Sequence, residues 1–173
     1  QLSYSTPMGA KSSTSHFGRK SYGKEFFNKD MPQIMADTGM PYVATAAESD
    51  PNDFIKKAAK AQYYAKNYGT AYIKCLSACP LNWGDKPSTE RQVISAAVNS
   101  CYFPLYEVEQ GCTNISYDPE KSNKKIHVTE WLKMMGRTKH LCSEKYKDIT
   151  DNIQQEIDRR WKRLKIKAET PEL

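Results

Sequence analysis

The sequence predicts an α/β fold with a mostly parallel sheet, followed by a helical carboxyl-terminal extension. Two observations carry this prediction. Between residues 30 and 108, segments with helix signals alternate with short apolar segments of the kind that form buried strands. From residue 149 onward, apolar residues recur at helical spacing in a strongly charged background. At 173 residues the chain is long enough for one folded domain, which at that size buries about 70% of its unfolded surface.

The first elements can be placed from local signals. Residues 1 to 24 are rich in Ser, Thr, Gly and Lys and lack periodic apolar residues, so we expect an extended loop. A loop of that length is usually functional or disordered. Asp30 is expected to cap a short helix that runs to Thr38, where Gly39 ends it. The segment from Pro41 to Ala46 is then expected to form an apolar strand.

A second helix follows this strand. Ser49 or Asp50 is expected to cap it, with Pro51 in the first turn and the end near Asn67, before Gly69. Its apolar face is expected to consist of Phe54, Ile55, Ala58, Ala59 and Ala65.

The next strand, from Ala71 to Leu76, leads to the most informative residue of the chain. In sheets built from alternating strands and helices, ligands bind beyond the carboxyl ends of the strands. Cys79 lies three residues past the expected strand end, in a turn closed by Pro and Gly, so we expect it to face a ligand. Cys75 adds only a C-x3-C pair, whereas iron-sulfur clusters usually take four cysteines. The alternative is that Cys79 is a buried structural thiol.

The alternation of helices and strands ends with one more pair. Ser88 or Thr89 is expected to cap a helix, and the segment from Pro104 to Val108 is expected to be a strand. The apolar residues of that helix are Val93, Ile94, Ala97 and Val98. Beyond it, residues 113 to 117 and 125 to 128 are expected to pair as a small hairpin.

The last third of the chain is basic and helical. Thr129 is expected to cap a short helix, and a long amphipathic helix follows with the apolar stripe Ile149, Ile153, Ile157, Trp161 and Leu164. Residues 121 to 173 carry 14 Lys or Arg and 8 Asp or Glu, so the whole net charge of +6 lies there. Acidic residues are interleaved throughout, as in a solvated helix face, and no nucleic-acid-binding motif accompanies them. We therefore expect no nucleic-acid partner.

The cysteines and the apolar segments bound the cellular context. Five scattered cysteines, an odd number, argue against a disulfide framework and favour reduced thiols in the cytoplasm. No apolar segment approaches the roughly 18 residues needed to span a bilayer. None of the three histidines, His16, His127 and His140, has partners at a convincing metal-binding spacing.

Several short motifs occur in an order that is informative about function. They are Gln1 to Ala10 (QLSYSTPMGA), Pro41 to Ala46 (PYVATA), Ala78 to Gly84 (ACPLNWG), Phe103 to Glu107 (FPLYE) and, more weakly, Gly136 to Leu141 (GRTKHL). In their order and spacing these motifs resemble the carboxyl-terminal part of the thiamine-diphosphate-binding (beta) subunit of 2-oxoacid:ferredoxin oxidoreductases. Pyruvate:ferredoxin oxidoreductase is the best-known member of that family.

This resemblance implies a domain organisation. Residues 1–110 would form the carboxyl-terminal half of a thiamine-diphosphate-binding α/β fold, with 1–24 as its active-site loop. Residues 111–173 would form a small hairpin and helical extension. The family's magnesium-binding motif and its amino-terminal Cys-x-x-Cys pair have no counterpart in this sequence. We therefore expect the chain to be part of a longer subunit; the alternative is that a separate chain supplies the missing half.

The resemblance also implies a function. It suggests a component of an enzyme that oxidatively decarboxylates a 2-oxoacid with coenzyme A and passes electrons to ferredoxin. The implied cofactors are thiamine diphosphate, magnesium and a [4Fe-4S] cluster, with Cys79 as the fourth cluster ligand. Gln1, Ser3, Ser5 and Thr6 would lie near the thiamine cofactor or coenzyme A, whereas Ser and Thr in a loop can also simply satisfy backbone groups.

The resemblance leaves substrate and partners open. Pyruvate is the leading substrate, and phenylglyoxylate or oxalate are alternatives. The implied partners are the alpha, gamma and ferredoxin-like delta subunits of the oxidoreductase. A function of another class remains open: a noncatalytic module that binds an acidic protein through its basic carboxyl-terminal helix.

Overall fold

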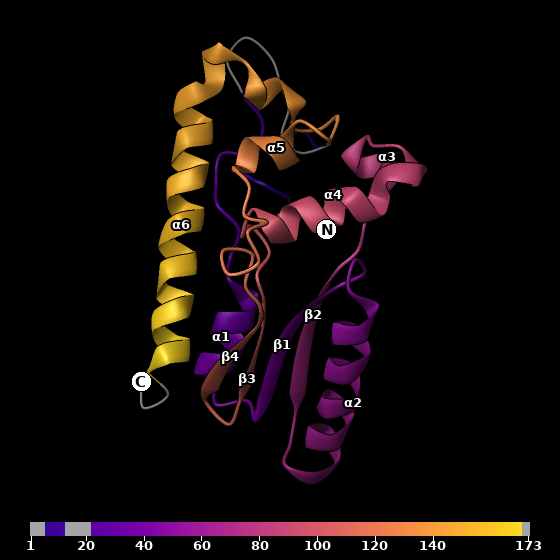
Figure 1. The fold of residues 1–173 in the computed structure, drawn as a ribbon, viewed down its shortest axis with the longest axis vertical. Helices are drawn as coiled ribbons and strands as arrows, with labels where there is room; N and C mark the ends of the chain where they lie inside the picture. Colours follow the sequence, from indigo (N-terminus) through magenta and orange to yellow (C-terminus); the bar gives the residue numbers. More distant parts are fainter. Residues whose placement is uncertain (1–5, 13–21, 171–173) are drawn as a thin grey trace.

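The computed structural model describes residues 6–12 and 22–170 (Figure 1). In chain order the elements are α1 (Met31–Asp37), β1 (Tyr42–Ala47), α2 (Pro51–Asn67), β2 (Ala71–Leu76), α3 (Pro80–Trp83), the 3-10 helix η1 (Pro87–Thr89), α4 (Glu90–Asn99), β3 (Leu105–Glu109), β4 (Cys112–Tyr117), α5 (Val128–Leu132), the 3-10 helices η2 (Lys139–Cys142) and η3 (Glu144–Tyr146), and α6 (Lys147–Glu169).

The predicted α/β class and the helical carboxyl-terminal extension are confirmed. In the described residues four strands form a sheet in the order β2-β1-β3-β4. The parallel pairing lies between β1 and β2, which are joined through α2, and β1 pairs antiparallel with β3. β3 and β4 form a hairpin whose turn residues, Gln110 and Gly111, both adopt positive φ. Two successive residues with positive φ match the twist of the flanking strands, which favours this antiparallel pairing.

The prediction that residues 113 to 117 pair with residues 125 to 128 is wrong. Instead of pairing with residues 125 to 128, strand β4 pairs with β3, and residues 124–127 form neither helix nor strand. The hairpin therefore spans residue 110, where the sequence predicted the boundary between two parts of the chain. That boundary remains a prediction.

The helix starts follow the predicted capping signals with three differences. The Asp50 side chain accepts a hydrogen bond from the Asp53 amide (3.1 Å), as expected for the N-cap of α2. At the start of α1, Asp30 occupies the N-cap position but its side chain makes no capping hydrogen bond. Thr89 occupies the N-cap position of α4, but its side chain makes no capping hydrogen bond. His127, not Thr129, caps α5, because its ring nitrogen Nδ1 accepts from the Thr129 amide.

The prediction that α2 buries an apolar face is wrong. Ile55 is 66% exposed, and the alanines expected beside it are exposed as well. The buried side chain of this helix is instead Lys57, which faces the sheet. Its ammonium donates to the Thr45 carbonyl, the Ser116 hydroxyl and the Asp53 carboxylate, so burial leaves none of its protons unsatisfied.

The apolar stripe of α6 is confirmed. Ile153, Ile157, Trp161 and Leu164 are buried, and Ile149 packs against the same core. The predicted apolar residues of α4 are buried there too. The core therefore joins the helical extension to the sheet in one continuous cluster.

The helices cover both faces of the sheet. Successive strand residues point to opposite faces, so Glu107 and Tyr106 face different helices. Glu107 bonds Lys60 of α2, whereas Tyr106 bonds Gln33 of α1. Figure 1 shows α2 and α6 as long helices on opposite sides of the strands. None of the helices in the described ranges has the length and apolar character required to span a membrane.

Candidate functional site

The Cys79 turn lies at the carboxyl ends of the parallel strands. β2 ends at Leu76, and three residues later Cys79 occupies the N-cap position of α3. The neighbouring strand end is held close, because the Glu48 amide donates to the Leu76 carbonyl (3.1 Å). Gly84, at φ 68°, closes the turn in the left-handed region that favours glycine. The predicted position of Cys79 beyond a strand end is thus confirmed.

Two glycines bring this turn against a distant segment. The Gly136 amide donates to the Gly84 carbonyl (3.2 Å), and the Arg137 amide donates to the Trp83 carbonyl (3.1 Å). A Cβ atom added at Gly136 would lie 3.0 Å from the Gly84 oxygen. Only a residue without a side chain allows this approach without displacement, so the motifs ACPLNWG and GRTKHL form one junction.

The opening motif joins the same junction. The Lys11 amide donates to the Arg137 carbonyl (2.8 Å). A Cβ atom added at Gly9 would lie 2.6 Å from the Leu141 side chain, and Gly9 has φ 79°. The structure therefore brings together three of the motifs that the sequence analysis singled out.

Arg137 is the charged centre of this junction. Its side chain is 6% exposed, and its guanidinium carbon lies 4.6 Å from the centre of the Trp83 ring, a cation–π contact. Burial lowers the pKa of Arg137 to about 10, while Tyr102, Asp85 and Cys79 act in the opposite direction. A guanidinium with this pKa is still charged at neutral pH.

Several buried polar atoms at the junction have no hydrogen-bond partner in the described structure. They are Nε of Arg137, both carboxylate oxygens of Asp85 and the hydroxyl of Thr6. Buried polar atoms normally have hydrogen-bond partners. A group bound beside the strand-end turn would supply partners for these four atoms.

The expected cofactor-binding residues are placed only in part. Thr6 is 1% exposed, and its carbonyl accepts a hydrogen bond from the buried Lys24 ammonium (2.8 Å). Gln1, Ser3 and Ser5 lie outside the described residues. Their role near a cofactor stays a prediction.

The described residues do not form a complete metal site, and the role of Cys79 as a cluster ligand stays a prediction. No group of three or more His, Cys, Asp or Glu side chains in the described ranges is arranged to hold a metal ion. Cys79 is half-buried, and its side chain makes no capping hydrogen bond. Cys101 is buried, and desolvation raises the pKa of its thiol to about 12. Burial also raises the pKa values of Cys75 and Cys142, so neither favours the thiolate form.

Arg137 and Asp85 were not predicted from the sequence as members of the site. Arg137 belongs to the weak GRTKHL motif, but no role was predicted for it. Asp85 directly follows the ACPLNWG motif. The sequence signal that could have pointed to them is the pair of glycines, Gly84 and Gly136. The close approach of these two glycines, however, is visible only in the folded chain.

Comparison with known proteins finds relatives that match nearly the whole chain. The chain is 42% identical over 164 residues to pyruvate synthase subunit PorB of Methanocaldococcus jannaschii, which is 95% of this chain and 52% of that protein. It is 35% identical over 165 residues to PorB of Thermotoga maritima, covering 95% of this chain and 49% of that protein. Ketoisovalerate oxidoreductase subunit VorB of Pyrococcus furiosus is 35% identical over 170 residues, 98% of this chain and 52% of that subunit.

These matches cover most of this chain, yet the chain spans only about half the length of the curated relatives it matches. No protein-family model matches the chain. Over nearly its whole length, the chain is homologous to the PorB and VorB beta subunits of 2-oxoacid:ferredoxin oxidoreductases.

Proposed function

We propose that this chain is a component of a 2-oxoacid:ferredoxin oxidoreductase. The enzyme would decarboxylate a 2-oxoacid, transfer the acyl group to coenzyme A and pass the electrons to ferredoxin. Pyruvate is the proposed substrate, since PorB relatives are named pyruvate synthase subunits, and the VorB relatives make ketoisovalerate the nearest alternative. Five free cysteines agree with a reducing cytoplasm as the proposed location.

The observation that carries this proposal is the convergence of three motifs at the Cys79 turn. Backbone hydrogen bonds link Lys11 to Arg137 and Arg137 to Trp83, although these residues are far apart in sequence. A loop proposed to border a cofactor is thereby held next to the cysteine proposed to bind a cluster. Electron transfer between two centres requires such proximity, which supports a shared role for these segments.

The proposed cofactors are thiamine diphosphate with magnesium and a [4Fe-4S] cluster. When bound, thiamine diphosphate supplies the carbon nucleophile that adds to the 2-oxo group, and the cluster accepts electrons one at a time. Cys79 would contribute one thiolate, and the remaining ligands would come from other polypeptide. The buried Arg137 guanidinium lies close enough to Cys79 for an electrostatic interaction, and Thr6 would offer its unpaired hydroxyl to the cofactor.

The proposed partners follow from the family. They are the alpha, gamma and ferredoxin-like delta subunits, free ferredoxin, coenzyme A and the 2-oxoacid. The strand-end position of Cys79 and the unpaired polar atoms beside it would face these groups.

The test is a cysteine comparison in the native complex that contains this chain. Cys79→Ala is expected to remove the absorbance and electron paramagnetic resonance signal of one cluster and abolish ferredoxin reduction. Cys112→Ala, which replaces an exposed cysteine at the start of β4, is the matched control and should leave both unchanged. An intact set of clusters in Cys79→Ala would refute the ligand assignment, and a native complex without any cluster would refute the proposed function.

A further inference from the structure

A cavity lies on the face of the sheet opposite α2. It has a volume of about 290 Å³, near the lower end of small-ligand sites. α6 lines one side, and the segment from residue 27 to α1 lines another. Phe103 and Tyr106 form an apolar wall, while Lys74 of β2 and Arg160 and Arg163 of α6 supply positive charge.

Lys74 is a half-buried cation without a neutralising partner. In the described structure its ammonium makes no hydrogen bond or ion pair, and it lies 5.8 Å from the centre of the Phe103 ring. Asp30 attracts it at longer range and Arg160 repels it, while burial is the main cause that lowers its pKa. Removing such a charge from water costs free energy unless a counter-charge binds.

A second buried ammonium increases this excess of positive charge. Lys24 is 7% exposed and donates to two neutral acceptors, the Thr6 carbonyl (2.8 Å) and the Asn28 side-chain oxygen (2.6 Å). Burial lowers the pKa of Lys24, and repulsion from Lys74 lowers it further. The two lysines therefore destabilise each other's charged form.

Two of the three acidic residues that line the cavity, Glu156 and Asp37, are already engaged. The carboxylate of the third, Asp30, attracts Lys74 at longer range but forms no hydrogen bond or ion pair within the described residues. Glu156 accepts hydrogen bonds from both Arg159 and Arg160 at 2.6–2.8 Å. Asp37 lies 3.7 Å from the Lys167 ammonium. Arg163, exposed at the edge of the cavity, makes no hydrogen bond or ion pair within the described residues, so positive charge remains unbalanced on both Lys74 and Arg163.

We propose that this cavity binds a small organic anion through a phosphate or carboxylate group held by Lys74 and Arg163. Ammonium and guanidinium groups form strong charge-assisted hydrogen bonds with both kinds of oxyanion. The apolar wall of Phe103 and Tyr106 would contact the organic part of the ligand. This site goes beyond the proposed oxidoreductase function and does not depend on it.

The experiment measures anion binding by the full-length native protein. Inorganic phosphate and acetate are titrated separately by calorimetry, with chloride at matched ionic strength as the reference. The phosphate arm and the acetate arm distinguish a phosphate-bearing ligand from a carboxylate ligand. We expect Lys74→Met to weaken binding of the preferred anion by about tenfold or more, the effect of losing one charge-assisted hydrogen bond.

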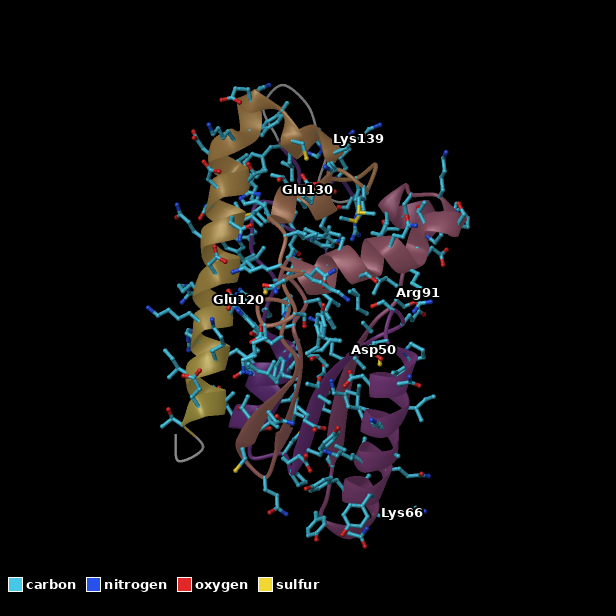
Figure 2. All side chains as sticks on the ribbon, in the orientation of Figure 1. Asp50, Lys66, Arg91, Glu120, Glu130 and Lys139 are labelled. Carbon is cyan, nitrogen blue, oxygen red and sulfur yellow. The ribbon has the colours of Figure 1, made fainter. Side chains whose placement is uncertain are left out.

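Lys66→Met is the matched control. It removes the same charge from α2, and Figure 2 shows Lys66 at the end of that helix, far from α6. Arg163→Gln tests the site independently at an exposed position where folding is not at risk. At low ionic strength the preferred anion should also raise the melting temperature of the wild type and the control but not that of Lys74→Met.

The proposal is overturned if neither anion binds more tightly than chloride. It is equally overturned if both Lys74→Met and Arg163→Gln bind the preferred anion as the control variant does. Weakened binding in either cavity variant, with unchanged binding in Lys66→Met, supports it.

Discussion

Glu120 joins two parts of the chain that are distant in sequence. Its carboxylate accepts hydrogen bonds from Lys125 (2.8 Å) and from Lys165 of α6 (2.6 Å). These two bonds are the main causes that hold the pKa of Glu120 at about 2, below its ordinary value of 4.5. In Figure 2, Glu120 lies beside α6. A single side chain thus connects the region after the hairpin to the last helix.

This pKa predicts a dependence of stability on pH. A carboxyl group with a lowered folded pKa stabilises the protein above its unfolded pKa, and that contribution is lost as pH falls through the folded pKa. We expect Glu120→Gln to show a smaller loss of unfolding free energy between about pH 5 and pH 2 than the wild type, in urea denaturation. The difference should be modest, because the Glu120 side chain is 35% exposed and solvent screens its ion pairs.

Glu144→Gln is the control for this measurement, since the Glu144 side chain is 90% exposed. It should keep the pH dependence of the wild type. Equal pH dependence in Glu120→Gln and the wild type would contradict the assignment.

At the scale of elements, apolar periodicity correctly predicts the buried face of α6 but not that of α2. α6 is a long helix with one apolar stripe, and that stripe is the buried face. α2 carries many alanines, but the face that it turns to the sheet is polar and consists of the buried Lys57 with the partly exposed Lys60 and Tyr64. Apolar spacing predicts burial only where the surface that receives the helix is also apolar; here Glu107 and Glu109 of β3 hydrogen-bond the polar face of α2.

The buried stripe of α6 gives a stability prediction with an internal control. Ile153→Ala removes a side chain that is 2% exposed and is expected to lower the free energy of unfolding by about 2–5 kcal/mol. Ile166→Ala makes the same substitution on the same helix at a position that is 45% exposed, and its effect should stay within about 0.5 kcal/mol. Chemical denaturation measures both, and equal effects would contradict the packing of α6 described here.

At the scale of the whole molecule, one edge of the sheet is uncovered. In the part of the chain that the structure describes, β2 pairs with β1 on one side and with no strand on the other. Large apolar side chains are exposed nearby, among them Ile55 on α2 and Leu81 in the Cys79 turn, which is 99% exposed. An open edge beside exposed apolar residues is the kind of surface that other polypeptide covers.

This edge predicts a difference in hydrogen exchange. We expect amides of β2 to be less protected in the chain alone than in the complete oxidoreductase complex, because an added strand would supply their missing acceptors. The amides of β1, which is paired on both sides, should be equally protected in both samples. Unchanged protection of β2 on assembly would show that this edge stays open.

Local signals in the sequence determined most of the elements. They placed α1, α2 and α4, the buried stripe of α6 and the position of Cys79 beyond the end of β2, because caps, helix-ending glycines and apolar spacing act within a few residues. The order of short motifs also pointed to the oxidoreductase subunits to which the chain is similar. These features depend on neighbouring residues, so one sequence is enough to read them.

Only the tertiary structure decided how these elements meet. It paired β4 with β3, turned Lys57 toward the sheet, and placed Arg137 against Trp83 beside Cys79. It also brought Lys74 close enough to Lys24 and to Arg160 for their charges to repel, and placed Lys74, Arg160 and Arg163 around one cavity. Apart from the β3–β4 hairpin, these contacts join residues far apart in the chain. All of them depend on which packed surfaces match, information that local propensity does not contain.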